Sequence, residues 1–149
     1  MSKRKGKVLI IDDDEDVLIT AKMILRSQFE QVQVESSPKQ LENIIKLKTP
    51  DIVILDMNFK TGATSGNEGL FWLRRIKQLA PDIQVIMNTA YGDIQLAVEC
   101  MKEGAIDFLV KPWEKEKLLS TVRNVFDLKE SKEEISRLES TSKAFEDDI

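Results

Sequence analysis

Val8-Leu9-Ile10-Ile11-Asp12-Asp13 is a continuous apolar run followed directly by two acidic residues. An apolar run of this length is typical of a β-strand that is buried on both faces. The same pattern recurs at Ile52-Val53-Ile54-Leu55, which Asp56 follows. Strands buried on both faces occur mainly in parallel sheets covered by helices on each side, so these two segments favour an α/β fold.

Other strand-like and helical segments alternate with these two runs along the chain. Further strands are expected around residues 32–34, 83–87 and 106–110, and apolar residues have helical spacing at 17–25, 41–45, 70–80, 94–101 and 118–126. Strict alternation of strand and helix predicts a parallel sheet with right-handed crossovers. Five such units suit the flavodoxin-like fold, a five-stranded parallel sheet of order 2-1-3-4-5 with helices on both faces.

The helical segment at residues 94–101 is apolar at most of its positions. Ile94, Ala97, Val98 and Met101 have helical spacing and predict a buried stripe. Leu96 and Cys100 fall off that stripe, so they are expected to be either part of a partner surface or scattered exposed apolar residues. Gly104 follows the segment and is expected to end the helix as its C-terminal cap.

The composition changes after about residue 128, where Lys, Glu, Ser and Arg dominate. We therefore divide the chain into a globular domain, residues 1–128, and a C-terminal helical extension, residues 129–149. Leu128, Ile135 and Leu138 fit a heptad seam, but serines occupy the same seam. A solvated helix and a coiled coil are both compatible with this pattern.

Composition and charge exclude several classes of function. The 149 residues carry a net charge of −4, which argues against direct nucleic-acid binding by this segment. No apolar run approaches the ~20 residues that span a bilayer, and the basic start leads into too short an apolar run for export. With a single cysteine and no histidine, the chain is expected in the cytoplasm, and any metal must be bound by oxygen.

Polar side chains follow four of the expected strands. Asp12 and Asp13 follow the first, Asp56 the third, Thr89 the fourth and Lys111 the fifth. Each alone has a plainer explanation, such as a helix cap, a turn residue or a solvated charge. Ligands of such sheets bind outside the carboxyl ends of the strands, so the coincidence of all five predicts one site on a shared rim.

The residue types in this set suit phosphoryl transfer. Three carboxylates at one place repel one another, and a divalent cation such as Mg²⁺ removes that repulsion. An ionised Asp56 can then act as a nucleophile toward phosphorus. The ammonium of Lys111 and the hydroxyl of Thr89 can contact the oxygens of the transferred group.

Four motifs of the chain resemble the signatures of bacterial two-component receiver domains, over roughly residues 6–128. They are Ile10-Ile11-Asp12-Asp13, Ile54-Leu55-Asp56-Met57-Asn58, Asn88-Thr89-Ala90 and Phe108-Leu109-Val110-Lys111-Pro112. The resemblance implies that Mg²⁺ is held by Asp12, Asp13, Asp56 and the backbone carbonyl of Asn58. It also implies that Asp56 is phosphorylated and that Thr89 and Lys111 bind the phosphoryl group. Phe108 matches the switch aromatic, whose ring turns inward when Thr89 moves, and the Lys111–Pro112 bond is expected to be cis.

The segment from Thr89 to Phe108 resembles receivers of nitrogen-regulation-type, sigma-54-dependent transcriptional activators. That resemblance implies a sensor histidine kinase as partner, and AAA+ and DNA-binding output domains to which residues 129–149 would lead. It also implies regulation of transcription and the ability to form a homodimer. The chain would then be no enzyme toward external substrates, although it would assist its own phosphorylation and dephosphorylation.

One departure from the receiver pattern lies after Asp56. A Met-Pro pair is absent, and the Gly that receivers carry about eight residues on corresponds to Gly69. This spacing implies an insertion within residues 59–68. Our hypothesis is that this loop controls access to the acceptor or shields the acyl phosphate from water. Shortening it should then change the dephosphorylation rate.

The acidic residues are also compatible in part with three other kinds of site or domain. A haloacid-dehalogenase-like phosphohydrolase would use Asp12 as nucleophile, but it would leave Asp56 without a role. An EF-hand-like reading of residues 12–23 lacks the required Gly and Glu. A degenerate receiver used only for binding conflicts with the intact acidic set. Labelling of Asp56 or of Asp12 separates the receiver from the hydrolase.

Overall fold

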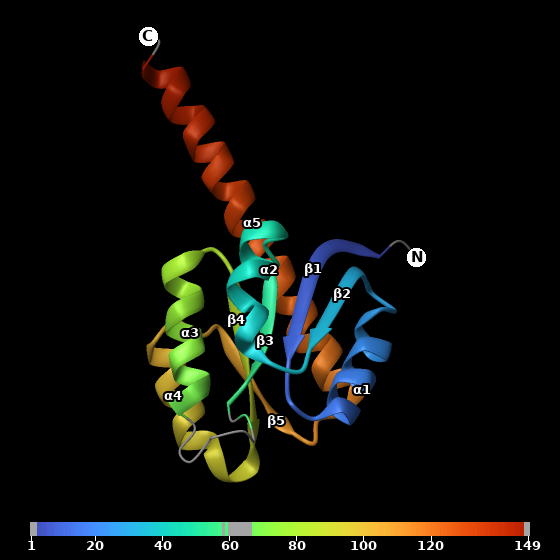
Figure 1. The fold of residues 1–149 in the computed structure, drawn as a ribbon. Helices are drawn as coiled ribbons and strands as arrows, with labels where there is room; N and C mark the ends of the chain where they lie inside the picture. The colour runs from blue at the N-terminus through green and yellow to red at the C-terminus, as the bar shows by residue number, and fades with distance from the viewer. Residues whose placement is uncertain (1–2, 58, 60–66, 148–149) are drawn as a thin grey trace.

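The computed structural model describes residues 3–57, 59 and 67–147 and contains a single five-stranded parallel sheet (Figure 1). The strands are β1 (Arg4–Ile11), β2 (Phe29–Glu35), β3 (Ile52–Asp56), β4 (Gln84–Ala90) and β5 (Asp107–Lys111). Their order is β2-β1-β3-β4-β5, which confirms the predicted flavodoxin-like topology. Val32 and Val34 belong to β2, the edge strand that their alternation with polar residues indicated.

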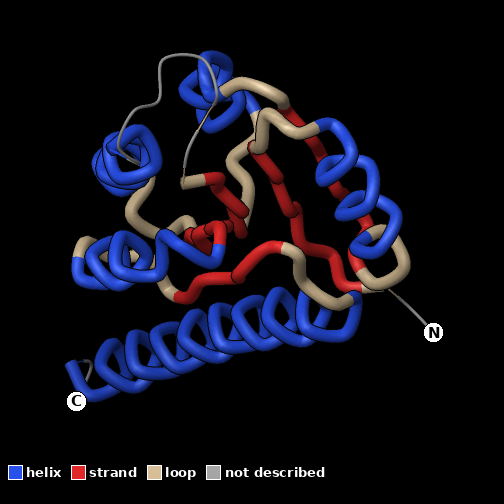
Figure 2. Tube along the Cα trace, turned by 90° about the horizontal axis from the view of Figure 1, so that it is seen from below, coloured by secondary structure: helices blue, strands red, loops and turns tan. Residues whose placement is uncertain are grey.

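Helices cover both faces of the sheet (Figure 2). They are α1 (Glu15–Leu25), α2 (Leu41–Leu47), α3 (Asn67–Leu79), α4 (Ile94–Lys102) and α5 (Lys115–Asp147), with short 3₁₀ turns η1 (Pro38–Gln40) and η2 (Tyr91–Asp93). Val8 and Ile10 of β1 pack with residues of α1 and α5. Leu9 and Ile11 point to the other face, where they pack with residues of α2, α3 and α4. Because neighbouring residues serve opposite faces, a fully apolar strand is required here.

The turn from β1 into α1 is fixed by the acidic run that follows the strand. Asp14 is the N-cap of α1, and its side chain accepts hydrogen bonds from the backbone N–H groups of Asp16 and Val17 at 2.9 and 3.4 Å. Aspartate is a preferred N-cap residue because its carboxylate can accept from these N–H groups, which have no partner within the helix. The capped turn leaves Asp12 and Asp13 at the carboxyl edge of the sheet.

The inward face of α4 differs from the predicted stripe. Cys100 is fully buried and Leu96 packs against the core, whereas Val98 and Met101 are 40% and 37% exposed. The expectation that Cys100 joins a partner surface was therefore wrong. Within residues 94–101 only two positions are polar, so apolar spacing alone does not define the rotation of this helix. The residue after the cap, Gly104, has a φ of 110°, which confirms its helix-ending role.

Helix α5 continues well past the sheet. Its first half packs on the core through Leu118, Val122 and Phe126, whereas residues 131–140 are all exposed. In Figure 1 the exposed half projects from the end of the molecule opposite the arrowheads of β1 and β2. At 1.5 Å per residue, the 33 residues of this helix extend about 50 Å. Among the described residues, none of the helices combines the length and apolarity that a membrane span requires.

Candidate functional site

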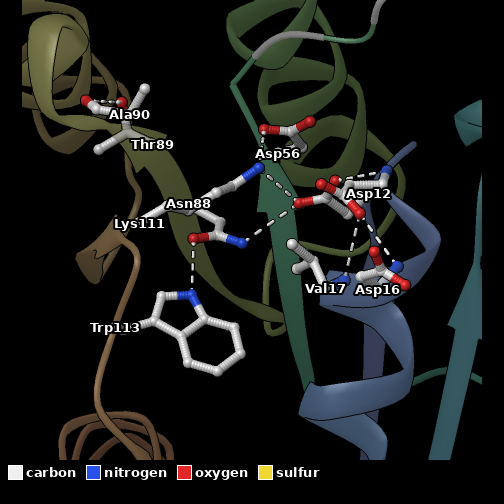
Figure 3. A network of polar contacts seen from close by, with 10 residues as sticks. Asp12, Asp16, Val17, Asp56, Asn88, Thr89, Ala90, Lys111 and Trp113 are labelled. Atoms are coloured by element: carbon white, nitrogen blue, oxygen red, sulfur yellow. Dashed lines mark hydrogen bonds and ion pairs between the residues drawn. The ribbon is translucent and has the colours of Figure 1, made fainter.

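Three charged side chains meet at the carboxyl edge of the sheet (Figure 3). Asp12 follows β1 and is completely buried, and Asp56 is the last residue of β3 and only 4% exposed. Ile11 lies level with Leu55 in the sheet, so these two carboxylates emerge from adjacent strands. Lys111, the last residue of β5, reaches both of them. The sheet thus brings together the residues that the sequence places after separate strands.

Lys111 supplies the positive charge of this site. Its Nζ lies 2.7 Å from Oδ2 of Asp12 and 3.2 Å from Oδ1 of Asp56. Burial by itself would lower the pKa of this ammonium. Its hydrogen bonds to Asp12 and Asp56 and the charges of both carboxylates outweigh burial and raise the pKa above its ordinary value. The lysine therefore stays charged at neutral pH, and it offsets the unfavourable burial of two carboxylates.

The acidic residues have the geometry of a divalent cation site. Asp12, Asp13 and Asp56 each offer a carboxylate oxygen, and these atoms all lie within 4.8 Å of one another. Hard cations such as Mg²⁺ prefer oxygen ligands of this kind. The donor set therefore fits the predicted metal. Asn58, whose backbone carbonyl was the fourth predicted ligand, lies outside the described residues.

The predicted switch residues occupy strands β4 and β5. Thr89 is fully buried, and its hydroxyl donates to the carbonyl oxygen of Ala90 at 3.3 Å. In Figure 3 it lies to one side of the carboxylates. Phe108 is half-buried, pairs with Met87 across the sheet and packs against the core cluster under α3 and α4. The Lys111–Pro112 peptide bond is cis, as expected.

The side chain of Asn88 contacts both Asp12 and Trp113, and the sequence motifs did not indicate these two contacts. Asn88 Nδ2 donates to Oδ2 of Asp12 at 3.3 Å, and Trp113 Nε1 donates to Oδ1 of Asn88 at 3.1 Å. The available signal was an amide within the otherwise apolar segment of β4, since Asn88 follows Val85, Ile86 and Met87. Its partners are distant in sequence, so only the folded chain identifies them.

Gly69 is packed against the end of β3 and the residue that follows it. Its backbone N–H donates to the carbonyl oxygen of Met57 at 3.1 Å. A Cβ at this position would lie 2.8 Å from the Cα and carbonyl oxygen of Met57 and 3.1 Å from the carbonyl oxygen of Asp56. Close approach of two backbones therefore requires glycine here. The insertion was predicted within residues 59–68, of which residues 60–66 lie outside the described residues.

Comparison with known proteins identifies the family. Residues 8–123 match the model of the response regulator receiver domain, and the chain belongs to this family. The chain is 31% identical to the response regulator protein TodT of Pseudomonas putida, over 93% of this chain and 65% of that protein. It is 28% identical to the alginate biosynthesis transcriptional regulatory protein AlgB of Pseudomonas aeruginosa, over 99% of this chain and 30% of that protein.

A solved structure agrees with this assignment. The N-terminal signal receiver domain of a two-component system response regulator from Bacteroides fragilis superposes with a TM-score of 0.74 and 43% identity, covering 81% of this chain and 96% of that one. The protein is thus a receiver domain of two-component systems whose relatives include transcriptional regulators. The phosphohydrolase alternative gains no support from these comparisons, and the chain spans only part of the length of TodT and AlgB.

Proposed function

We propose that Asp56 accepts a phosphoryl group from a sensor histidine kinase and that this modification switches the protein between two states. The observation that carries the proposal is the contact of one cation, Lys111, with two buried carboxylates, Asp12 and Asp56. Such an arrangement places a nucleophile beside a charge that can hold phosphate oxygens, and phosphoryl transfer depends mainly on that positioning.

Asp12, Asp13 and Asp56 would hold Mg²⁺, with the backbone carbonyl of Asn58 as a further ligand. When bound, the ion supplies positive charge beside the transferring group. A carboxylate oxygen of Asp56 forms the new bond to phosphorus, and the donor departs with the electrons of the bond that breaks. Lys111 has the raised pKa that keeps its ammonium charged throughout this step.

The switch proposed here uses Thr89 and Phe108. Phosphorylation adds negative charge and acceptor oxygens to Asp56. The hydroxyl of Thr89, now 3.3 Å from the carbonyl oxygen of Ala90, would turn to one of these oxygens. Phe108, which is half-buried, would then move inward into the space that Thr89 leaves. Such a change is a shift between two pre-existing arrangements, biased by the new charge.

The partners proposed for the whole protein follow its relatives. AlgB is a transcriptional regulatory protein, and this chain covers 30% of its length. We therefore propose that AAA+ and DNA-binding output domains of the sigma-54-dependent type follow residue 149, that the protein can form homodimers, and that it works in the cytoplasm.

The proposed boundary lies at residue 128. Residues 129–149 would form a helical linker, because the side chains of residues 131–140 are all exposed. A chain of residues 1–130, which keeps Lys129 with its side chain only 11% exposed, should then have the unfolding free energy of the full chain within about 0.5 kcal/mol in urea titrations, as exposed positions rarely contribute more. A much larger loss would place the linker within the domain.

The test of the acceptor is phosphorylation by acetyl phosphate with Mg²⁺, followed by intact-mass measurement and mapping of the modified residue. One phosphoryl group is expected on Asp56, none on Asp56→Asn, and none on the native protein when EDTA removes the metal. Asp82→Asn, an exposed acid at the opposite end of the sheet, is the matched control and should be labelled normally. Label on Asp12 or turnover of external phosphate esters would instead favour the hydrolase.

A further inference from the structure

Three polar side chains form a continuous path away from the acidic site. Asn88, which is 1% exposed, lies between Asp12 and Trp113 (Figure 3). Its Nδ2 donates to Oδ2 of Asp12 at 3.3 Å, and its Oδ1 accepts from Nε1 of Trp113 at 3.1 Å. The NH₂ group and the carbonyl oxygen of the Asn88 amide thus each form a hydrogen bond within the folded protein.

The indole fixes the direction of this path. The Nε1–H of Trp113 can only donate a hydrogen bond, so Asn88 must turn its carbonyl oxygen toward the ring. The NH₂ group of Asn88 then necessarily points to Asp12, where it meets a carboxylate oxygen that can only accept when ionised. Without the indole N–H, the amide could reverse and present its oxygen to that carboxylate, which would be repulsive.

The carboxylate oxygen at the end of this path is shared. Oδ2 of Asp12 also lies 2.7 Å from Nζ of Lys111, and Oδ1 of Asp12 accepts from the backbone N–H of Asp14 at 2.9 Å. Three hydrogen-bond donors therefore determine the orientation of the Asp12 carboxylate. Of these donors, the side chain of Asn88 is the one that also contacts Trp113. Groups that orient ligands in this way commonly tune the affinity of metal sites.

The other end of the path reaches the protein surface. Trp113 lines a cleft of about 410 Å³ together with Val17 and Thr20 of α1 and with Pro112. The ring also packs against the core cluster under α1 and α5. The path thus joins a completely buried carboxylate to the wall of an open cleft.

We propose that Asn88 and Trp113 are positioning residues that orient Asp12 for metal binding and couple the acidic site to the cleft beside α1. The part that concerns the metal rests on the function proposed above, whereas the coupling does not. If the amide only fills space in the core, Trp113 will not respond to changes at Asp12.

The coupling is tested by NMR of the indole N–H groups in the metal-free protein. Asp12→Asn is expected to move the Trp113 resonance and leave that of Trp72, the other tryptophan, in place. In an Asn88→Ala background the same change should no longer move the Trp113 resonance. A Trp113 resonance that ignores Asp12→Asn, or responds equally without Asn88, overturns the proposal. Trp72→Phe assigns the two signals.

The metal arm uses Mg²⁺ titrations followed by tryptophan fluorescence or calorimetry. Trp113→Phe, which removes the N–H and keeps an aromatic ring, and Asn88→Ala should each weaken Mg²⁺ binding by about tenfold. The double variant should be no weaker than Asn88→Ala alone, because the indole acts through the amide. Trp72→Phe should bind as the native protein does. If both variants bind Mg²⁺ with native affinity, the positioning role is refuted. If the native protein does not bind Mg²⁺ at all, the proposed function is refuted, and the NMR experiment alone decides the coupling.

Discussion

Substitution of Gly69 by alanine tests whether backbone packing positions Asp56, the proposed phosphoryl acceptor. The new Cβ would lie 2.8 Å from two backbone atoms of Met57 and 3.1 Å from the carbonyl oxygen of Asp56. Backbone atoms cannot rotate away as a flexible side chain can, so either α3 or the end of β3 must move. Insertion of a methyl group into such a space typically costs about 1–3 kcal/mol, and the better helix propensity of alanine returns at most about 1 kcal/mol. With the full return, the free energy of unfolding should therefore fall by up to about 2 kcal/mol.

The effect on function should exceed the effect on stability. A displacement of Asp56 relative to Lys111 spoils the alignment of nucleophile and phosphoryl group, and misplacement by about 1 Å can slow a reaction on the order of 100-fold. We expect slower labelling of Gly69→Ala by acetyl phosphate at temperatures where the variant is fully folded. Urea titration gives the stability, and the rate of mass increase gives the function.

Gly92→Ala is the matched control. No heavy atom lies within 4 Å of a Cβ built at Gly92, which belongs to the 3₁₀ turn after β4. Its stability should stay within about 0.5 kcal/mol of the native value, and its labelling rate should be unchanged. If Gly69→Ala matches Gly92→Ala in both measurements, the packing of α3 on Met57 does not position the acceptor.

Two further predictions concern Lys111 and Cys100. Lys111→Met leaves two buried carboxylates without their cation, so the metal-free variant should lose about 3 kcal/mol of unfolding free energy. Addition of Mg²⁺ should restore part of this loss. Equal stability of variant and native protein without metal would contradict the charge balance described for the site. Burial raises the pKa of the Cys100 thiol from its ordinary 9.0 to about 11. The thiol of the unfolded chain therefore ionises at lower pH than the thiol of the folded protein. The unfolding free energy of the native protein should decrease as pH rises from 9 to 11, by at most about 1.4 kcal/mol per pH unit. The unfolding free energy of Cys100→Ala should decrease less steeply over the same range. Parallel pH profiles of the two proteins would show that burial does not affect this thiol.

The architecture could be predicted because its signals are local. A strand that packs helices on both faces must be apolar throughout, and residues 8–11 and 52–55 carry that signature. The carboxyl ends of parallel strands share one edge, so Asp12, Asp56 and Lys111 could be assigned to a common site without coordinates. Their observed proximity confirms that part of the reasoning.

Only the tertiary structure decided which contacts these residues make. The rotation of α4, which buries Cys100 and exposes Val98, is set by packing on the sheet, because apolar residues surround most of that helix. The link from Asp12 through Asn88 to Trp113 joins positions that are 76 and 25 residues apart. Sequence spacing carries information on secondary structure and strand ends, whereas such contacts depend on side-chain orientations that are fixed when distant segments pack together.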